Sequence, residues 1–339
     1  MIILIALSAA TWGMVFGSMP VSRDTKPVRV VITQGASARI IADSLKKSGV
    51  IRSPLTFLLT SKMGSVSEKL KPGVYEMNRS MSVPEVVRVL VEGNTLESWV
   101  TIPEGKTLRE IADILESKQL ANPDTFLGLT MLQGDTFAAY HLPYDGNLEG
   151  YLFPDTYLIE RGTTVDKIIR MMLDTFERKV VREHRDEIEQ VIKNKFGLGE
   201  DGFDYGLRRV LVIASMIERE AKTPDDRPKI AAVIWNRLAR DMKLEIDATV
   251  TYRLGESRAN KTRVYYKDLE NSSLYNTYRH WGLPPAPICN PGLASILAAL
   301  RPADIDALYY VARKDGTHVF NKTLEQHNAA KKAIKEGAL

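Results

Sequence analysis

Between residues 208 and 238, the apolar and polar positions have the spacing of two helices joined by a short polar turn. The first helix carries apolar residues three or four positions apart, from Val210 to Ala221. Pro224 interrupts this pattern, and Pro228 suits the opening turn of a second helix. The pattern therefore predicts a helical hairpin, around which the rest of the chain can be interpreted.

Two acidic residues, Glu218 and Glu220, interrupt the apolar first helix near its C-terminal end, where the helix dipole favours cations. At about 100° per residue their side chains point roughly 200° apart, so they cannot act as a pair on one face. We expect one of them to be half-buried or to line a cleft, where desolvation raises the pKa of a carboxyl toward that of a general acid. The alternative is a structural helix end whose acids pair with Arg219, Lys222 or Arg227, and spacing alone does not choose between Glu218 and Glu220.

The first part of the chain contains an internal repeat. Residues 30–45 align with residues 100–115, and each copy has the pattern of a strand, a Gly turn and an amphipathic helix. Residues 75–87 likewise resemble residues 157–169, so a strand–helix–strand–helix unit occurs twice. The extra residues of the second copy are expected between residues 126 and 150. Such a unit either binds a ligand or serves as a structural spacer.

The segment from residue 261 to residue 292 is long, irregular and rich in Tyr, Trp, Asn and Pro. Loops of this length are usually functional or disordered, and the many aromatic residues argue against disorder. Aromatic faces beside Asn, Thr and Arg donors are what a sugar-binding groove needs. A packed structural loop with aromatic anchors is the alternative.

The remaining segments are expected to be a mixture of helices and strands. Residues 176–196 have the pattern of a charged helix, and residues 244–252 alternate as in a strand. A helix from Pro291, two strands at 307–312 and 317–320, and a terminal helix are expected to close the chain.

Composition and charge exclude several classes of site. The net charge is +4 without a basic cluster, which does not indicate nucleic acid binding. The single Cys289 rules out a disulfide framework and a multi-thiolate metal site, and the histidines lack the spacing of a helical zinc motif. We therefore expect neither a metal nor a cofactor.

Residues 1–21 contain no charged side chain, and about 20 apolar residues span a bilayer. A cleaved signal would need a basic first region and a small-residue cleavage site, and neither is evident. Arg23 and Lys26 follow the segment, which argues mildly against export of the body. A retained membrane anchor is the better interpretation.

Several motifs, in this order along the chain, resemble those of one family, the MltG/YceG-like endolytic murein transglycosylases. The matching segments are EGYLFPDTY (Glu149–Tyr157), ASMIERE (Ala214–Glu220), VIWNRL (Val233–Leu238), YNTY (Tyr275–Tyr278), GLPPAPICNPG (Gly282–Gly292) and HVFNKTLEQHN (His318–Asn328). Where the family usually has Gln-x-Asp-Pro-Thr, this chain has Glu245 to Thr249 with Ala248 in place of proline.

The resemblance implies an α+β protein in the inner membrane, with a single-pass anchor (1–21), two LysM-like units (28–98 and 99–185) and a periplasmic catalytic domain (186–339). Its substrate would be the glycan strands of peptidoglycan, and its expected role the limitation of nascent strand length. Peptidoglycan synthases are the candidate protein partners.

The catalytic glutamate of the family falls on Glu218, which makes the choice that spacing left open. In such an enzyme one carboxyl protonates the glycosidic oxygen and then accepts the proton of the attacking muramyl C6 hydroxyl. The candidates for orienting the sugar and stabilising positive charge are Asn236, Asp247, Thr249, Tyr252, Tyr275 and Asn276. Two rival functions remain: a lysozyme-like hydrolase with Asp247 or Glu245 as second carboxylate, and a non-catalytic wall-binding protein.

Overall fold

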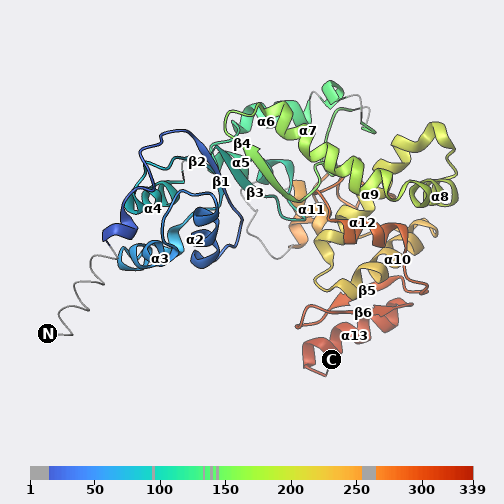
Figure 1. The fold of residues 1–339 in the computed structure, drawn as a ribbon. Helices are drawn as coiled ribbons and strands as arrows, with labels where there is room; N and C mark the ends of the chain where they lie inside the picture. Colours follow the sequence, from blue (N-terminus) through green and yellow to red (C-terminus); the bar gives the residue numbers. More distant parts are fainter. Residues whose placement is uncertain are drawn as a thin grey trace. The chain divides into compact units, whose positions relative to one another are not determined.

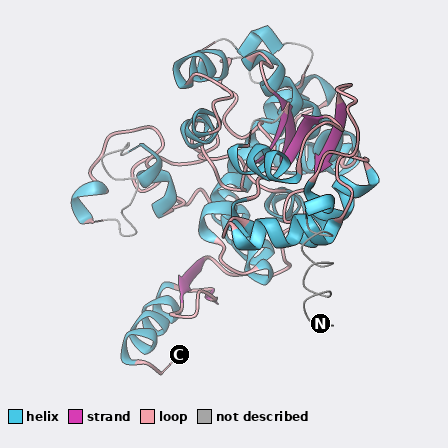
Figure 2. Cartoon of the chain, turned by 60° about the vertical axis from the view of Figure 1, so that its left-hand side comes forward, coloured by secondary structure: helices cyan, strands magenta, loops and turns pink. Residues whose placement is uncertain are grey.

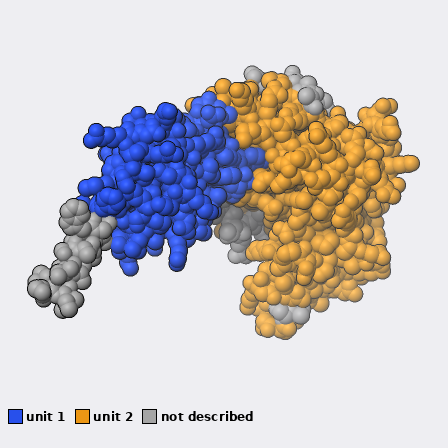
Figure 3. All heavy atoms as spheres, in the orientation of Figure 1, with its two compact units in different colours: residues 1–101, 156–163 blue, residues 102–155, 164–339 orange. Residues whose placement is uncertain are grey.

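The computed structural model has a mixed α+β fold, as the sequence predicts (Figure 1). It describes residues 15–93, 96–132, 134–137, 140–142, 145–253 and 265–338. The chain divides into two compact units, which Figure 3 colours separately. Unit 1 comprises residues 1–101 and 156–163, and unit 2 comprises residues 102–155 and 164–339.

Most of the predicted anchor, residues 1–14, lies outside the described residues. Within the described part of the chain, no helix has the length and apolar character needed to cross a bilayer.

Unit 1 is built on a four-stranded antiparallel sheet, seen as the larger group of magenta strands in Figure 2, away from the strand pair near the C-terminus. Its strands lie in chain order: β1 (Val28–Ile32), β2 (Gly73–Met77), β3 (Glu97–Thr101) and β4 (Thr156–Glu160). Three helices supply the core beside it: α2 (Ala38–Lys47), α3 (Pro54–Met63) and α4 (Val83–Glu92). Val30 of β1, Leu45 of α2 and Phe57 of α3 are fully buried in this core.

The two sequence repeats have the same order of elements. In each, a strand is followed by two helices, a second strand and a third helix. The second copy consists of β3, α5 (Leu108–Ser117), α6 (Pro123–Met131), β4 and α7 (Val165–Phe176). The pattern missed one helix in each copy, α3 and α6, both of which begin with proline after a side-chain N-cap. The extra residues of the second copy lie between α6 and β4, as predicted.

The predicted helical hairpin forms in unit 2. α9 (Phe203–Glu220) is joined to α10 (Arg227–Leu238) by the short 3₁₀ turn η5 (Pro224–Asp226). α12 (Leu293–Leu300) packs against both helices, and the centre of α9 is completely buried. The remaining short helical turns are η1 (Ser67–Lys69), η2 (Gly134–Phe137), η4 (Glu200–Gly202) and η7 (Tyr266–Asp268).

One predicted strand is wrong. Residues 244–252 contain helix α11 (Asp247–Arg253) instead of a strand. Within the helix Thr249 and Val250 are adjacent and both buried, which a helix allows but the alternation of a half-buried strand does not. Asp247 in the first turn also complements the helix dipole, which favours the helix.

The other predicted elements form with small changes. The charged helix is divided into a π-helical segment (Glu177–Arg182) and α8 (Arg185–Phe196). At the C-terminal end, β5 (Tyr309–Ala312) and β6 (His318–Asn321) form an antiparallel pair, followed by α13 (Leu324–Glu336).

Candidate active site

Glu218 lies in the last turn of α9, with its side chain only 8% exposed. The backbone N–H of Gly292 donates to its Oε2 over 3.0 Å. Since Gly292 is the N-cap of α12, the carboxylate lies at the positive end of a second helix, although it is at the unfavourable end of its own. The Arg227 guanidinium lies 3.9 Å from Oε1, which is one of the ion pairs that the sequence suggested.

Two backbone segments meet beside Glu218. Lys106 and Asn290 form an isolated antiparallel bridge, and the N–H of Gly105 donates to the Asn290 carbonyl over 2.9 Å. Gly105 has a φ of +76°, and a Cβ at this position would lie 3.5 Å from Cγ of Glu218. The turn that carries Gly105 therefore covers one side of the candidate acid.

The same turn supplies a second carboxylate, that of Glu104. A Cβ on Gly292 would lie 1.9 Å from Oε1 of Glu104, so this carboxyl group occupies the space that a side chain at position 292 would need. The pKa of Glu104 is raised, first by partial burial and then by the negative charge of Glu218, while Arg227 opposes the rise.

Sequence reasoning missed Glu104. The turn was identified only as the Gly turn of the second repeat. The corresponding position in the first copy is Gln34, and this exchange of an amide for a carboxylate was the available signal.

A third carboxyl group, that of Glu149, is buried next to the site and accepts hydrogen bonds from three of the surrounding segments. It is 2% exposed and accepts hydrogen bonds from the Leu108 N–H (3.1 Å), from Nδ2 of Asn290 (3.0 Å) and from the Tyr252 hydroxyl (3.0 Å). Burial raises the pKa of Glu149 to about 8, against the effect of these donors. The interpretation of the EGYLFPDTY motif did not include this role.

Asn290 joins Glu149 to the loops around Glu218. Its Oδ1 accepts from the N–H groups of Gly150 and Leu152, and its Nδ2 also donates to the Lys106 carbonyl. The ring of Tyr252 lies 5.1 Å from that of Tyr275, centroid to centroid. Two of the predicted substrate-binding residues, Tyr252 and Tyr275, are thus brought together next to this network.

Three other predicted residues have structural contacts. The Asn236 amide donates to the carbonyls of Ile305 and Ala307. Asn276, completely buried, donates to two backbone carbonyls within its own loop. Thr249, also completely buried, donates to the Ile246 carbonyl. The contacts of these side chains fix the backbone around the hairpin.

Asp247 belongs to a second acidic cluster, with Glu220. The Tyr278 hydroxyl donates to Asp247 over 2.6 Å, and the Tyr310 hydroxyl donates to Glu220 over 3.2 Å. The pKa of Glu220 is raised to about 7, first by burial and then by the charge of Asp247. The two glutamates of α9 therefore contribute to different clusters, as their angular separation predicts.

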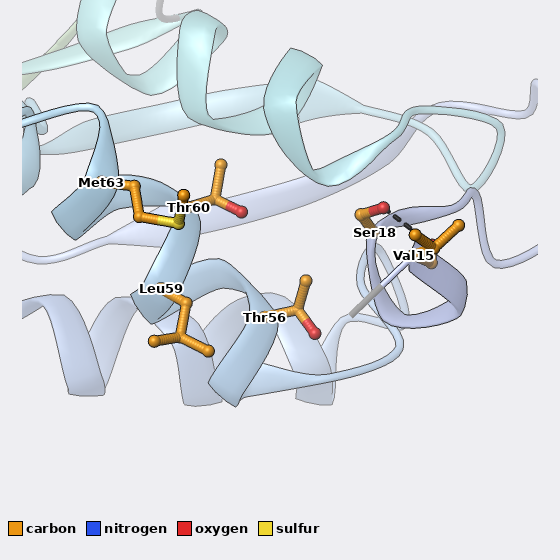
Figure 4. Close-up of a pocket in the computed structure, with 6 residues that line it drawn as sticks. All are labelled: Val15, Ser18, Thr56, Leu59, Thr60 and Met63. Carbon is orange, nitrogen blue, oxygen red and sulfur yellow. Dashed lines mark hydrogen bonds between the residues drawn. The ribbon is translucent and has the colours of Figure 1, made fainter. Parts of the chain in front are cut away.

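Unit 1 contains a separate small cavity of about 200 Å³, between residues 15–18 and helix α3 (Figure 4). Its lining side chains carry no titratable group: Val15, Ser18, Thr56, Leu59, Thr60 and Met63. This cavity therefore offers no acid–base chemistry.

Comparisons with known proteins identify the family to which this chain belongs. The sequence model of the YceG-like family matches residues 30–333. The chain therefore belongs to the YceG-like family.

Named relatives and a solved structure support this assignment. The endolytic murein transglycosylase of Bacillus subtilis (strain 168) is 36% identical over 327 residues, which cover 92% of this chain and 86% of that protein. The endolytic murein transglycosylase of Streptococcus pneumoniae serotype 2 (strain D39) is 30% identical over 340 residues, covering 91% of this chain and 59% of that protein. A crystal structure of a yceG-like protein from Listeria monocytogenes shares 34% identity with a TM-score of 0.59, covering 90% of this chain and 99% of that one.

Proposed function

We propose that this chain is an endolytic lytic transglycosylase of peptidoglycan. It cleaves the MurNAc–GlcNAc bond within glycan strands and leaves 1,6-anhydroMurNAc ends. The family assignment and the names of the relatives support this activity. The observation that carries it in the structure is the nearly buried Glu218 carboxyl, which accepts a hydrogen bond from the Gly292 N–H at the start of α12.

One carboxyl is sufficient for the reaction. Glu218 donates its proton to the glycosidic oxygen as the bond from C1 to that oxygen breaks, and positive charge develops at C1. The muramyl C6 hydroxyl then attacks C1, and its proton passes to Glu218. No water is consumed, and the acid is regenerated. While Glu218 is ionised, the Gly292 N–H and the Arg227 guanidinium stabilise its negative charge.

The hydrolase alternative requires a second carboxylate at a suitable distance from the first. The two residues considered for this role have other partners in the structure: Glu245 accepts from Arg237 over 3.0 Å, and Asp247 accepts from Tyr278. These contacts favour the transglycosylase over a hydrolase that uses Asp247 or Glu245.

Mass spectrometry of digested peptidoglycan tests the proposed function. Incubation of purified sacculi with the chain is expected to produce muropeptides with anhydro ends. New reducing ends would instead establish a hydrolase. Fragments of neither kind would favour the wall-binding alternative.

We propose further that the two repeat units, within residues 28–98 and 99–185, are LysM-like and bind the glycan strand that the catalytic domain, residues 186–339, cleaves. Their matched order of elements supports a duplication. A variant chain lacking residues 28–98 should retain less glycan in a pull-down with sacculi.

Residues 1–21 are proposed to anchor the chain in the cell membrane, with its body on the outer side and peptidoglycan synthases as partners. Sequencing the N-terminus of the mature protein and fractionating the cells test the anchor. A mature protein that begins after residue 19 in the soluble fraction would refute it. Crosslinking in intact cells tests the synthase contact.

A further inference from the structure

An apolar stripe faces solvent on helix α3 of unit 1. Leu55, Leu59 and Met63 are spaced four residues apart, which places them on one face of this helix. Leu55 and Met63 are among the most exposed apolar residues of the described chain. The other side of the helix is apolar as well, because Phe57 is completely buried in the core of unit 1. A helix at the surface of a soluble domain normally presents polar residues to water, so this stripe is suited to an apolar environment.

Residues 15–19 extend this stripe beside α3. Three of them are apolar and exposed: Val15, Phe16 and Met19. Gly17 is buried against the helix, since a Cβ at this position would lie 2.3 Å from Oγ1 of Thr56. The small cavity of Figure 4 is lined by side chains from both segments. The two apolar surfaces are therefore continuous, and together they form what we call the α3 face: Val15, Phe16, Met19, Leu55, Leu59 and Met63.

Arg52 holds residues 16–21 on unit 1. Its guanidinium donates to the Pro20 carbonyl over 3.0 and 2.8 Å, and to the Val21 carbonyl over 2.7 Å. It also lies 4.9 Å from the ring centroid of Phe16, within the range of a cation–π contact. Because of these contacts, the segment and α3 belong to one packed body.

The charges around the α3 face are positive. Residues 15–23 and 51–66 contain no acidic residue, and they carry Arg23, Arg52 and Lys62. Arg23 and Lys62 are exposed, and Lys62 lies in the last turn of α3. Apolar side chains flanked by cations are typical of protein surfaces that lie in the interface of an anionic bilayer.

We propose that the α3 face lies in the surface of the lipid bilayer, with its apolar side chains at the acyl chains and with Arg23 and Lys62 at anionic headgroups. This inference rests on the proposed membrane anchor, residues 1–21, and not on the chemistry of Glu218. Residues 15–21 belong both to that anchor and to the segment packed on unit 1. An anchor that enters the bilayer here brings α3 to the same surface, so the bilayer, rather than a second copy of the chain, is the occupant that the structure favours.

The contact adds to the anchor rather than replacing it. An anchor alone leaves the attached unit free to rotate at the membrane surface, whereas a second contact beside it removes this freedom. Unit 1 contains the first repeat unit, which would then meet glycan strands in one orientation. Interfacial surfaces of this kind lie about 5–10 Å deep, at the boundary between headgroups and acyl chains.

Quenching of a fluorescent probe at position 63 tests this depth. Met63→Cys can be labelled with an environment-sensitive dye, since the native Cys289 is buried. The full chain is reconstituted in vesicles of phosphatidylcholine and phosphatidylglycerol whose acyl chains carry bromine near the headgroups. We expect the emission of the probe to shift to the blue and to be quenched several-fold.

Val31→Cys, labelled in the same way, is the matched control within unit 1. Val31 is an exposed apolar residue of β1 that alternates with the buried Val30 and Ile32. Its side chain therefore points to the face of the sheet opposite the helices, and its probe should be neither shifted nor quenched. Equal quenching at positions 31 and 63 would overturn the proposal.

A substitution on the α3 face provides a second test. Leu55→Glu would place a carboxylate at the acyl chains and beside anionic headgroups, so the quenching of the probe at position 63 should fall several-fold. Since Leu55 is exposed, the melting temperature of this variant should not change. Val31→Glu makes the same change in charge on the far side of the sheet and should leave the quenching unchanged. Equal quenching in Leu55→Glu and in the unsubstituted chain would overturn the proposal.

Flotation of the same vesicles separates this inference from the proposed anchor and from the proposed reaction. A chain that floats with the vesicles while its probe at position 63 stays unquenched would overturn the inference and leave the anchor intact. A blue shift without quenching would mean that protein, such as a second copy, covers the α3 face, and it would also overturn the inference. A chain that does not float would refute the anchor together with the inference. The release of anhydro ends from sacculi tests the transglycosylase independently of all these outcomes.

Discussion

Asn290 donates from Nδ2 to Oε1 of Glu149 over 3.0 Å, in a site where both residues are almost completely buried. Through this bond, residues that lie far apart in the sequence fix the loops on which Glu104 and Gly292 approach Glu218. Unpaired buried polar groups are costly, so a fully bonded network of this kind rigidifies its surroundings. The geometry of the candidate acid therefore depends on a second glutamate that takes no part in the proposed reaction.

Stability should depend on pH through Glu149. Its pKa rises from 4.5 in the unfolded chain to about 8 in the folded one, so the folded state holds the proton over a range in which the unfolded state has lost it. The contribution of this group to stability is present below pH 4.5 and is lost as the pH rises to 8, by about 3–5 kcal/mol.

Glu149→Gln should remove this loss. Its amide resembles the protonated carboxyl: the oxygen can accept from Leu108 and Asn290, and the nitrogen can donate to Tyr252. Urea denaturation from pH 5 to pH 8 measures the difference between the variant and the wild type. A difference that stays constant over this range would contradict the raised pKa. Glu149→Ala, which leaves the donors unpaired, should cost about 2–4 kcal/mol.

Arg208, whose side chain is nearly buried, should stabilise the hairpin through an ion pair with the partly exposed Asp145. Its guanidinium bonds both oxygens of Asp145, at 2.8 and 2.5 Å, and its Nε donates to the Pro285 carbonyl. Asp145→Ala would leave the Arg208 charge unpaired in a site where that side chain is 7% exposed, at a cost of about 3–5 kcal/mol. Arg208→Ala should cost less, since Asp145 is 40% exposed and can be hydrated.

Chemical denaturation of both variants of this pair gives the comparison. A loss below about 1 kcal/mol for Asp145→Ala would mean that the pair behaves as a surface salt bridge.

Among the aromatic residues of the 261–292 segment, Trp281 is the one that we expect to stack on a sugar. It is 66% exposed, and Nζ of Lys243 lies 4.1 Å from the ring centroid. Trp281→Ala should weaken glycan binding about three- to tenfold, because stacking on an aromatic face contributes on the order of 1 kcal/mol. The melting temperature should not change.

Isothermal titration calorimetry with soluble glycan strands, on a Glu218→Gln background that prevents turnover, measures the effect of Trp281→Ala. Leu274→Ala is the matched control, since Leu274 is 67% exposed in the same segment but offers no aromatic face. Equal affinities for the two variants would refute the role of Trp281.

The sequence predicted the hairpin, its two diverging glutamates and the C-terminal strand pair. These features depend on local spacing, which remains visible in the chain. The helix at 247–253 was missed because polar residues alternate with Ile246, Ala248 and Val250 as in a strand, and the burial of the adjacent Thr249 becomes visible only in the folded chain. Glu104 and Glu149 were missed as site residues because tertiary contacts alone bring them to the hairpin.

Residue type also gave a poor guide to side-chain direction. Asn236 and Asn276 were candidates for sugar binding, but their amides donate to backbone carbonyls. Nothing in the local sequence distinguishes an amide that faces a substrate from one that holds a loop.

The release of anhydro-muropeptides by Glu218→Gln and Glu220→Gln, at equal folded concentration, tests the central claim most directly. Glu218→Gln retains the shape of the side chain but cannot transfer the proton, so its turnover should fall by about 10²–10⁴-fold while glycan binding is retained. Glu220→Gln, in the other cluster, should keep most of its turnover and mainly change stability. If Glu220→Gln is the inactive variant and Glu218→Gln keeps most of its activity, the assignment of Glu218 is contradicted.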